Sequence, residues 1–207
     1  MNEELSPAER FARAKQAKKH SAVNDFTALL NFPLDPFQEQ ACQALAEGNG
    51  VLVAAPTGAG KTIVGEFAIH LAIQEQQKVF YTTPIKALSN QKYLELVNRY
   101  GQERVGLLTG DTNQNSDAQI VVMTTEVLRN MIYANSESLM NLGYVVMDEV
   151  HYLADRFRGA VWEEVILHLP KDVKIVSLSA TVSNAEEFGA WLDEVRGDTQ
   201  IIVSEIR

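Results

Sequence analysis

The sequence contains a single cysteine, and this scarcity limits how the fold can be stabilised. Cys42 has no partner in the chain, so an internal disulfide is excluded and a reducing, cytoplasmic setting is expected. No apolar run approaches the roughly 20 residues that a membrane span needs, and the polar start Met1-Asn2-Glu3-Glu4 is unlike a secretory signal. A chain of 207 residues can instead bury a core large enough to fold without disulfides.

Positive charge is also scarce. The 18 Lys and Arg residues against 27 Asp and Glu residues give a formal net charge of −9. A chain with this balance does not hold a polyanion by bulk electrostatics, so any contact with nucleic acid must be local.

Basic residues concentrate in the segment 1–25, which we expect to be a peripheral helix separate from the domain formed by residues 26–207. Ser6, Pro7 and Glu9 predict a capping box with proline at the first helical position. Phe11 is the only large aromatic or aliphatic side chain in the helical part that follows. We favour a solvated basic helix over a nucleic-acid contact for this segment.

Short apolar runs alternate with helical patterns from residue 31 onward. The predicted strands are Val51–Ala54, Val79–Thr83, Val105–Thr109, Ile120–Thr124, Tyr144–Asp148, Lys174–Ser179 and Ile201–Val203. The predicted helices between them include Thr62–Gln76, Pro84–Asn98, Glu126–Ala134 and Ala185–Val195. Strands that are apolar on both faces are typical of parallel sheets covered on each side. The sequence therefore predicts an α/β fold: a doubly wound, mostly parallel sheet with helices on both faces.

A glycine-rich loop follows the first predicted strand and leads into a helix. Its pattern is G-x-x-x-x-G-K-[ST], with Ala55 in place of the first glycine, and it comprises Pro56, Thr57, Gly58, Ala59, Gly60, Lys61 and Thr62. Backbone N–H groups in such a loop bind phosphate, and the helix N-terminus adds its dipole. Lys61 is predicted to neutralise the β- and γ-phosphates of ATP, and Thr62 to bind Mg²⁺. We favour this interpretation over a plain glycine-rich turn.

Two adjacent acids end another apolar strand. Asp148 suits the coordination shell of Mg²⁺, and Glu149 suits the polarisation of an attacking water. Lys61, Asp148 and Glu149 are therefore the predicted catalytic residues, with Thr62 and Asp148 at the metal. A solvated acidic turn is the alternative, and the phosphate loop in the same chain counts against it.

A helix preceding the phosphate loop is predicted from Asp35 and Pro36 at its start and Gly48 at its end. Cys42 falls among its apolar residues and is expected to be an inert core thiol. Gln38 is the unusual polar group in its first turn, and its amide could make the paired hydrogen bonds that distinguish adenine from guanine.

The phosphate loop, the sequence Asp148-Glu149-Val150-His151 and the sequence Ser179-Ala180-Thr181 resemble, in that order, motifs I, II and III of superfamily 2 DExH-box helicases. The segments 148–170 and 177–192 are similar to the superkiller-type, exosome-associated RNA helicases throughout. The resemblance covers roughly residues 31–204. It implies the first RecA-like, P-loop domain of an ATP-dependent RNA helicase that couples ATP hydrolysis to translocation or unwinding.

The resemblance also implies roles for individual residues. Phe32 would stack on adenine and Gln38 would hydrogen-bond it, while His151, Ser179 and Thr181 would couple ATP to nucleic acid. The single-strand track would contain Thr83, Pro84, Lys86, Gly110, Asp111, Thr124 and Thr125. Elementary physics supports the track, because Pro84 and Thr125 are predicted to begin helices and a free helix N-terminus binds backbone phosphate.

Nothing after Thr181 resembles motifs IV to VI, so the second RecA-like domain and its arginine fingers are expected to be outside this chain. The isolated domain is then expected to bind ATP weakly and hydrolyse it very slowly. Single-stranded RNA is the expected partner, within an RNA-degradation complex. A DNA helicase of the same superfamily stays open, because backbone contacts do not by themselves sense the 2′-hydroxyl. An ATP-gated RNA clamp without unwinding activity also stays open.

Overall fold

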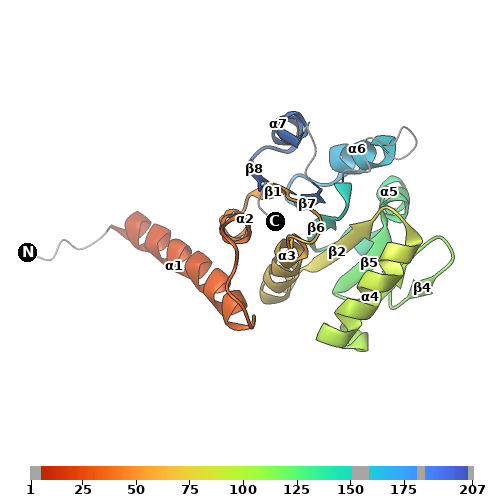
Figure 1. Ribbon diagram of the computed structural model, residues 1–207, viewed down its shortest axis with the longest axis horizontal. Helices are drawn as coiled ribbons and strands as arrows, with labels where there is room; N and C mark the ends of the chain where they lie inside the picture. The colour runs from red at the N-terminus through yellow and green to blue at the C-terminus, as the bar shows by residue number, and fades with distance from the viewer. Residues whose placement is uncertain (1–5, 151–158, 181–184, 205–207) are drawn as a thin grey trace, which may run out of the picture.

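The centre of the computed structural model, which describes residues 6–150, 159–180 and 185–204, is one eight-stranded sheet (Figure 1). The strands are β1 (Gly50–Ala54), β2 (Lys78–Thr83), β3 (Val105–Leu108), β4 (Asn113–Gln114), β5 (Ile120–Thr124), β6 (Leu142–Met147), β7 (Lys174–Ser179) and β8 (Thr199–Val203). Their order is β4-β3-β5-β2-β6-β7-β1-β8. All neighbours are parallel except β3 and β4.

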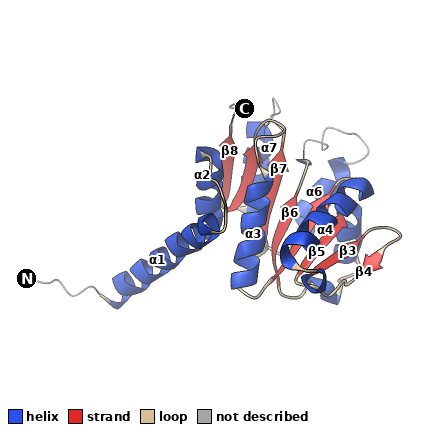
Figure 2. Ribbon diagram, turned by 60° about the horizontal axis from the view of Figure 1, so that its bottom comes forward, coloured by secondary structure: helices blue, strands red, loops and turns tan. Residues whose placement is uncertain are grey.

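Helices cover both faces of the sheet (Figure 2). The α-helices are α1 (Pro7–Ala28), α2 (Pro36–Ala46), α3 (Thr62–Gln74), α4 (Lys86–Tyr100), α5 (Thr125–Tyr133), α6 (Gly159–His168) and α7 (Ala185–Arg196). Short 3₁₀ helices span Gln102–Arg104 and Glu137–Leu139. Helices α2, α3 and α4 lie on one face, with one apolar cluster, and α5, α6 and α7 lie on the other, with a second cluster. The predicted doubly wound α/β sheet is confirmed.

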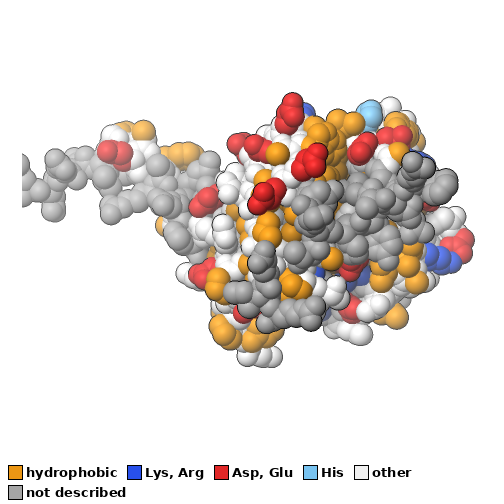
Figure 3. Space-filling model, turned by 45° about the horizontal axis from the view of Figure 1, so that its top comes forward, with side chains coloured by type: hydrophobic (Ala, Val, Ile, Leu, Met, Phe, Trp, Pro, Cys, Tyr) orange, Lys and Arg blue, Asp and Glu red, His pale blue; other side chains and the backbone are white. Residues whose placement is uncertain are grey.

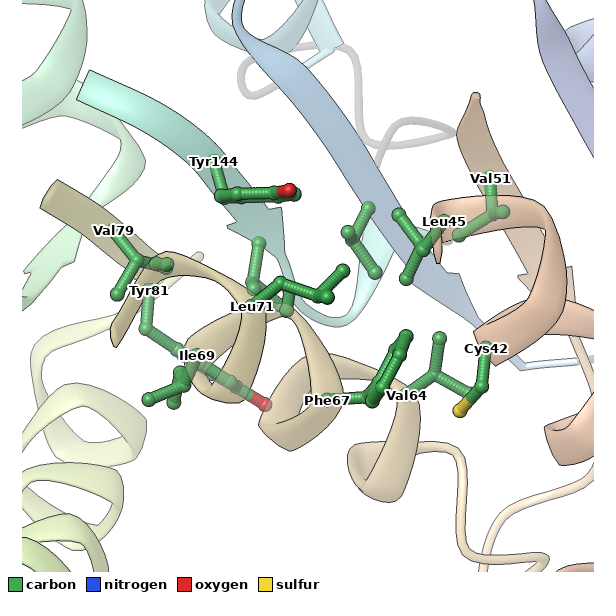
Figure 4. Packing of buried hydrophobic residues seen from close by; sticks show 14 of the residues in the cluster. Cys42, Leu45, Val51, Val64, Phe67, Ile69, Leu71, Val79, Tyr81 and Tyr144 are labelled. Atoms are coloured by element: carbon green, nitrogen blue, oxygen red, sulfur yellow. The ribbon is translucent and has the colours of Figure 1, made fainter. Parts of the chain in front are cut away.

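The central strands are buried on both faces because helices cover each side. Every residue of β1 and β6 is buried, as the runs of apolar side chains predicted. Figure 4 shows Tyr81, Phe67 and Cys42 among the buried side chains around α3. Cys42 is fully buried, and desolvation raises the pKa of its thiol to about 12, with a smaller contribution from the charge of Glu39. The expected place of Cys42 in the core is confirmed, and its lack of reactivity stays a prediction.

Helix α1 projects from the body of the molecule (Figures 1 and 2). Its predicted capping box is present, since Glu9 N–H donates to Ser6 Oγ and Ser6 N–H donates to Glu9 Oε2. Phe11 is 73% exposed, whereas Phe26 near the end of the helix is buried. The helix is therefore attached through its last turns and crosses residue 25 without a break.

Some boundaries differ from the predictions. Helix α4 begins at Lys86 rather than Pro84, because Ile85 is extended (φ −141°, ψ 150°). Strand β4 and helix α6 have no counterpart among the predicted elements. Strand β8 is an edge of the sheet, paired only with β1 among the described residues, and its Ile201 and Val203 side chains are 36% and 45% exposed.

Acidic side chains are spread over the face shown in Figure 3, and basic side chains are few on it. This distribution matches the formal net charge of −9. Across the described residues, no helix combines the length and apolarity that crossing a bilayer requires.

Candidate functional site

The glycine-rich loop joins the carboxyl end of β1 to the amino end of α3. Gly58 and Gly60 have φ values of +85° and +80°, a left-handed conformation that costs glycine little and other residues more. The N–H of Ala55 donates to Ser179 O across the sheet at 3.2 Å, which fixes the start of the loop to β7. Glycine therefore stands where the backbone must turn back on itself, as a phosphate loop requires.

Lys61 lies across the mouth of this loop. Its Nζ donates to Ala55 O at 2.7 Å and to Pro56 O at 2.9 Å. Desolvation lowers the pKa of the Lys61 ammonium, while the negative charges of Glu149 and Asp148 act in the opposite direction. The ammonium is thus held between two carbonyls where an anionic oxygen could replace them.

Gln38 connects α2 to the loop. Its Nε2 donates to Gly60 O at 3.0 Å, and its Oε1 accepts from Asp35 N–H at 2.9 Å. The side chain is only 3% exposed. Both the nitrogen and the oxygen of the amide therefore already have a partner in the protein. Contact with adenine would use the second hydrogen of Nε2 and the second lone pair of Oε1. Phe32 is 48% exposed, which leaves its ring accessible.

Asp148 and Glu149 follow β6 at the same edge of the sheet. The N–H of Asp148 donates to Thr82 O at 3.0 Å, so the β2–β6 pairing continues to this residue. Asp148 Oδ1 accepts from Glu149 N–H at 2.9 Å, and Oδ2 accepts from Tyr81 Oη at 2.7 Å. Glu149 has φ +58°, an uncommon conformation for a residue other than glycine that often marks a functional turn.

One cavity of about 270 Å³ brings several predicted residues together. It is lined by Thr62, Thr83, Leu88, Gln91, Lys92, Glu95, Asp148 and Glu149. Hydroxyl and carboxylate oxygens such as those of Thr62 and Asp148 are the ligands that Mg²⁺ prefers, and Mg²⁺ completes its shell with phosphate oxygens and water. The donor set therefore fits a magnesium–nucleotide complex rather than an all-protein metal cage, since no group of three or more His, Cys, Asp or Glu side chains in the described part of the chain is placed to hold a metal ion.

Thr83 and Thr125 hold the loops beyond β2 and β5 together. Thr125 Oγ1 donates to Thr83 O at 3.3 Å, and the Thr83 hydroxyl bonds to Ser89 Oγ at 2.7 Å and to Ile85 O at 3.0 Å. Both threonine side chains are buried. Any contact with nucleic acid at these two positions would therefore involve the backbone.

The adjoining residues of the predicted track lie at the surface. Lys86 and Asp111 form an ion pair that joins the loop after β2 to the loop after β3, where Gly110 is exposed. Pro84 and Thr124 are partly buried at the ends of β2 and β5. Ile85 and Thr124, the residues that precede α4 and α5, make no side-chain cap hydrogen bond. These helix N-termini therefore keep backbone donors that a phosphate could use.

Three residues were predicted to couple the two sites. Ser179 ends β7 and is 3% exposed, and its hydroxyl donates to Ala180 O at 2.8 Å. His151 and Thr181 lie outside the described residues.

Tyr81 is a residue at the site that the sequence motifs do not identify. It lies in the middle of β2, fully buried, and yet its hydroxyl reaches Asp148. The available signal is a phenol in the middle of a strand expected to be buried, since a buried tyrosine hydroxyl needs a hydrogen-bond partner.

The mostly parallel sheet, with a phosphate-type loop after β1 and an acidic pair after β6, defines a RecA-like P-loop domain. A family model for the DEAD/DEAH box helicases matches residues 35–188, and the chain belongs to this family. The chain is 68% identical over 182 residues to probable helicase HelY of Mycobacterium leprae, covering 88% of this chain and 20% of that protein. It is 46% identical over 173 residues to the antiviral helicase SKI2 of Saccharomyces cerevisiae, covering 84% of this chain and 13% of that protein.

Further relatives and structures agree with this assignment. A chloroplastic DExH-box ATP-dependent RNA helicase, DExH15 of Arabidopsis thaliana, is 44% identical over 191 residues, covering 89% of this chain and 16% of that protein. A hypothetical ATP-dependent RNA helicase from Sulfolobus tokodaii matches with a TM-score of 0.67 and 20% identity, covering 89% of this chain and 57% of that one. The DUF1998 helicase MrfA, bound to DNA and AMPPNP, matches with a TM-score of 0.72 and 21% identity, covering 89% and 29%. At these identities the two structures support the fold alone.

Proposed function

We propose that this chain is the ATP-binding domain of a helicase that uses ATP hydrolysis to move along, or unwind, single-stranded RNA. The observation that carries the proposal is the shared cavity, because Thr62, Asp148 and Glu149 line it together with Thr83, the residue that joins β2 to the predicted track. ATP chemistry and nucleic-acid contact would then meet in one place. Membership of the DEAD/DEAH box helicases supports both halves of the proposal.

In the ATP half of the site, the residues divide the work by their chemistry. The loop 55–60 would surround the phosphates with backbone N–H groups, and Lys61 would neutralise their charge. Thr62 and Asp148 would hold Mg²⁺, which neutralises charge that develops during phosphoryl transfer. Glu149 would orient the attacking water, since enzymatic phosphoryl transfer depends mainly on positioning and electrostatics.

In the nucleic-acid half, the helix N-termini at α4 and α5 would bind backbone phosphates with Lys86 beside them. Such contacts position a strand without reading its bases. RNA is the favoured substrate because DExH15 is named an RNA helicase. The second candidate is DNA, since MrfA was solved with DNA bound. Comparing the ATPase stimulation of the full-length protein by single-stranded RNA and DNA tests the choice, and stronger stimulation by DNA would reject RNA.

The chain spans about a fifth of the length of the HelY relatives that it matches. We propose that a second RecA-like domain supplies arginine groups to the ATP, and that this chain alone hydrolyses ATP very slowly. An arginine finger contributes about 10³–10⁵ in rate in related phosphoryl transfer. RNA-stimulated hydrolysis by this chain at the rate of the full-length protein would contradict this. The cytoplasmic location and the RNA-degradation complex stay predictions.

The central test is Glu149→Gln in the full-length protein. The amide preserves the shape of the side chain but removes the charge that would orient water, so hydrolysis should fall by about 10²-fold or more while ATP binding is retained. Strand displacement should be lost together with hydrolysis. A variant that still hydrolyses ATP at the normal rate would refute the assigned chemistry. If the wild type hydrolyses ATP but separates no strands, the protein is an ATP-gated clamp.

A further inference from the structure

Tyr81 makes a contact with the proposed metal ligand that the ATP-binding motifs do not include. Its side chain is fully buried in β2, and its Oη donates to Asp148 Oδ2 at 2.7 Å. Residues 81 and 148 are far apart in the sequence, and the register that pairs Tyr81 with Val146 brings them together. A buried phenol requires a partner, and the partner that this fold provides is the carboxylate at the site.

Strand β2 holds Asp148 at more than one point. Thr82 O accepts from the Asp148 backbone N–H at 3.0 Å, and the adjacent residue, Tyr81, donates to its side chain. The other carboxylate oxygen, Oδ1, accepts from Glu149 N–H at 2.9 Å. With a donor on each oxygen, the carboxylate has a fixed orientation before any ligand arrives, and each oxygen keeps a further lone pair.

The ring of Tyr81 is confined by α3 and α4. A Cβ atom on Gly65 of α3 would lie 3.1 Å from Tyr81 Cε2 and 3.1 Å from Val146 Cγ1, so a larger residue here would press on the Tyr81 ring and on Val146. Glycine inside a helix costs roughly 1 kcal/mol relative to alanine. On the α4 side, Lys92 Nζ lies 5.3 Å from the ring centroid. The phenol is therefore held in one place by packing on both sides.

The Tyr81 hydroxyl also stays protonated. Desolvation, reinforced by the negative charge of Asp148, raises the pKa of Tyr81 well above its usual value. In this bond the Tyr81 hydroxyl is the donor and Asp148 Oδ2 is the acceptor.

We propose that Tyr81 is a positioning residue for the metal site, and that its hydroxyl holds the Asp148 carboxylate in the orientation that binds Mg²⁺ with the nucleotide. This inference rests on the proposed function. The bond restricts Asp148 to one rotamer, so a Mg²⁺–nucleotide complex meets a preorganised ligand instead of one that must be ordered on binding. Without the hydroxyl, the same carboxylate would bind Mg²⁺ more weakly.

Tyr144 provides a matched control within the same sheet. It lies on β6, is 5% exposed and donates from Oη to Glu75 Oε2 at 2.9 Å. Figure 4 shows both tyrosines among the buried side chains around α3. Tyr144→Phe therefore removes the same kind of hydrogen bond, a phenol to a carboxylate, at a position whose acceptor is not a proposed metal ligand.

The experiment measures the Mg²⁺ dependence of nucleotide binding in the full-length protein, using a fluorescent ADP analogue titrated with MgCl₂. Tyr81→Phe should raise the Mg²⁺ concentration for half-maximal binding about tenfold, the order expected for losing a hydrogen bond to a charged group. Nucleotide affinity in EDTA should not change. Tyr144→Phe should lower the unfolding temperature about as much as Tyr81→Phe does. It should leave the Mg²⁺ requirement at the wild-type value. Equal Mg²⁺ dependence for both variants and the wild type would overturn the positioning role.

Gly65→Ala tests the same idea with the phenol intact. The added methyl group should displace the Tyr81 ring and raise the Mg²⁺ requirement in the same direction, and an unchanged requirement would count against the proposal even if Tyr81→Phe failed to fold. A wild type that binds nucleotide equally well with and without Mg²⁺ would overturn the proposed function as well. A Mg²⁺-dependent wild type beside an unshifted Tyr81→Phe variant would overturn the positioning role alone.

Discussion

Individual glycines of the phosphate loop have different neighbours, although both have a positive φ. A Cβ atom on Gly60 would lie 2.7 Å from Gln38 Nε2, whereas one on Gly58 would meet nothing within 4 Å. A substitution at either position would therefore strain the backbone. Only a substitution at Gly60 would also bring the new side chain into collision with Gln38. Comparing substitutions at the two positions therefore separates the free-energy cost of backbone strain from the cost of the collision with Gln38 of α2.

We predict that Gly58→Ala lowers the free energy of unfolding by about 1–2 kcal/mol, because alanine is strained in the left-handed region. Gly60→Ala should cost more, since the Gln38 amide must also move. Urea denaturation of the two variants measures the difference. Equal losses would show that Gln38 yields without cost, and the double variant with Gln38→Ala should then be no more stable than Gly60→Ala.

The motif residues could be predicted from the sequence because their spacing is local. Lys61 and Thr62 stand at fixed offsets from Gly58 and Gly60, and Asp148 and Glu149 are adjacent. The Tyr81 contact could not be predicted in this way, because it depends on which strands become neighbours and in what register. Similarly, only the structure shows that the hydroxyls of Thr83 and Thr125 are turned inward.

Elements are joined in part by single side chains, and Arg196 is the strongest example. This last residue of α7 donates to the carbonyls of Ile166, Leu169, Pro170 and Val173 at 3.2, 2.6, 2.6 and 2.9 Å. Those carbonyls lie at and beyond the end of α6, where a helix leaves acceptors without partners. The guanidinium thus closes α6 and attaches α7 to it.

We predict that Arg196→Ala lowers the free energy of unfolding by about 2–3 kcal/mol, the cost of leaving carbonyls without a charged donor. Arg196→Lys should recover only part of this, because an ammonium lacks the planar fork that reaches several carbonyls. Chemical denaturation of both variants measures the effect. Full recovery by lysine would mean that charge alone, and not the geometry of the guanidinium, holds the two helices together.

Helix α1 is attached through an aromatic group that includes a titratable ring. His70 of α3 packs against Phe26 and Phe67, with ring centroids 5.5 and 6.1 Å away. Its buried Nε2 has no hydrogen-bond partner among the described residues. Desolvation lowers the pKa of His70, the charge of Asp25 on α1 acts to raise it and the charge of Arg99 on α4 acts to lower it.

We predict that the packing of α1 against His70 contributes less to the free energy of unfolding at acid pH. Because the folded-state pKa of His70 is lowered, the unfolded chain takes up the proton first as the pH falls below about 6.5, and this contribution to the free energy of unfolding is then lost. Thermal unfolding between pH 7.5 and 5.5 should show the loss, and His70→Phe, which keeps an aromatic ring, should reduce it. An identical pH dependence in the variant would assign the effect to other groups.

Whether an element could be predicted depended on how clear the apolar pattern of its sequence is. Strand β5 is a run of Ile, Val and Met residues covered on both faces, so its composition alone identifies it. Strand β4 is two exposed polar residues, Asn113 and Gln114, with no apolar pattern to detect. In α6, Leu167 is exposed while neighbouring apolar residues are buried, which blurs the helical periodicity.

At the scale of the whole molecule, the proposed binding of nucleic acid requires an acidic domain to hold a polyanion through a few local contacts. Helix N-termini and Lys86 are the proposed contacts, and each phosphate neutralised on a single strand contributes a slope of about −0.7 to the dependence of log K on log salt. Few contacts therefore imply a weak salt dependence.

We predict a slope between about −1 and −3 for a labelled uridine oligonucleotide binding to this chain, measured by fluorescence anisotropy over a range of salt concentrations. Lys86→Ala should make the slope about 0.7 shallower. Lys174→Ala is the matched control, because Lys174 begins β7 and so lies at the amino ends of the parallel strands, whereas the proposed contacts lie at their carboxyl ends. A steeper wild-type slope, or equal effects of the two variants, would place the nucleic acid elsewhere.

The side of β8 that pairs with no other strand among the described residues has a consequence for colloidal behaviour. An edge strand with exposed Ile201 and Val203 is a template for pairing with a second copy of itself. Mutual repulsion between molecules with a formal net charge of −9 opposes such pairing at neutral pH. That repulsion vanishes near the isoelectric point of about 5.0, so solutions of this domain should be handled well above that pH.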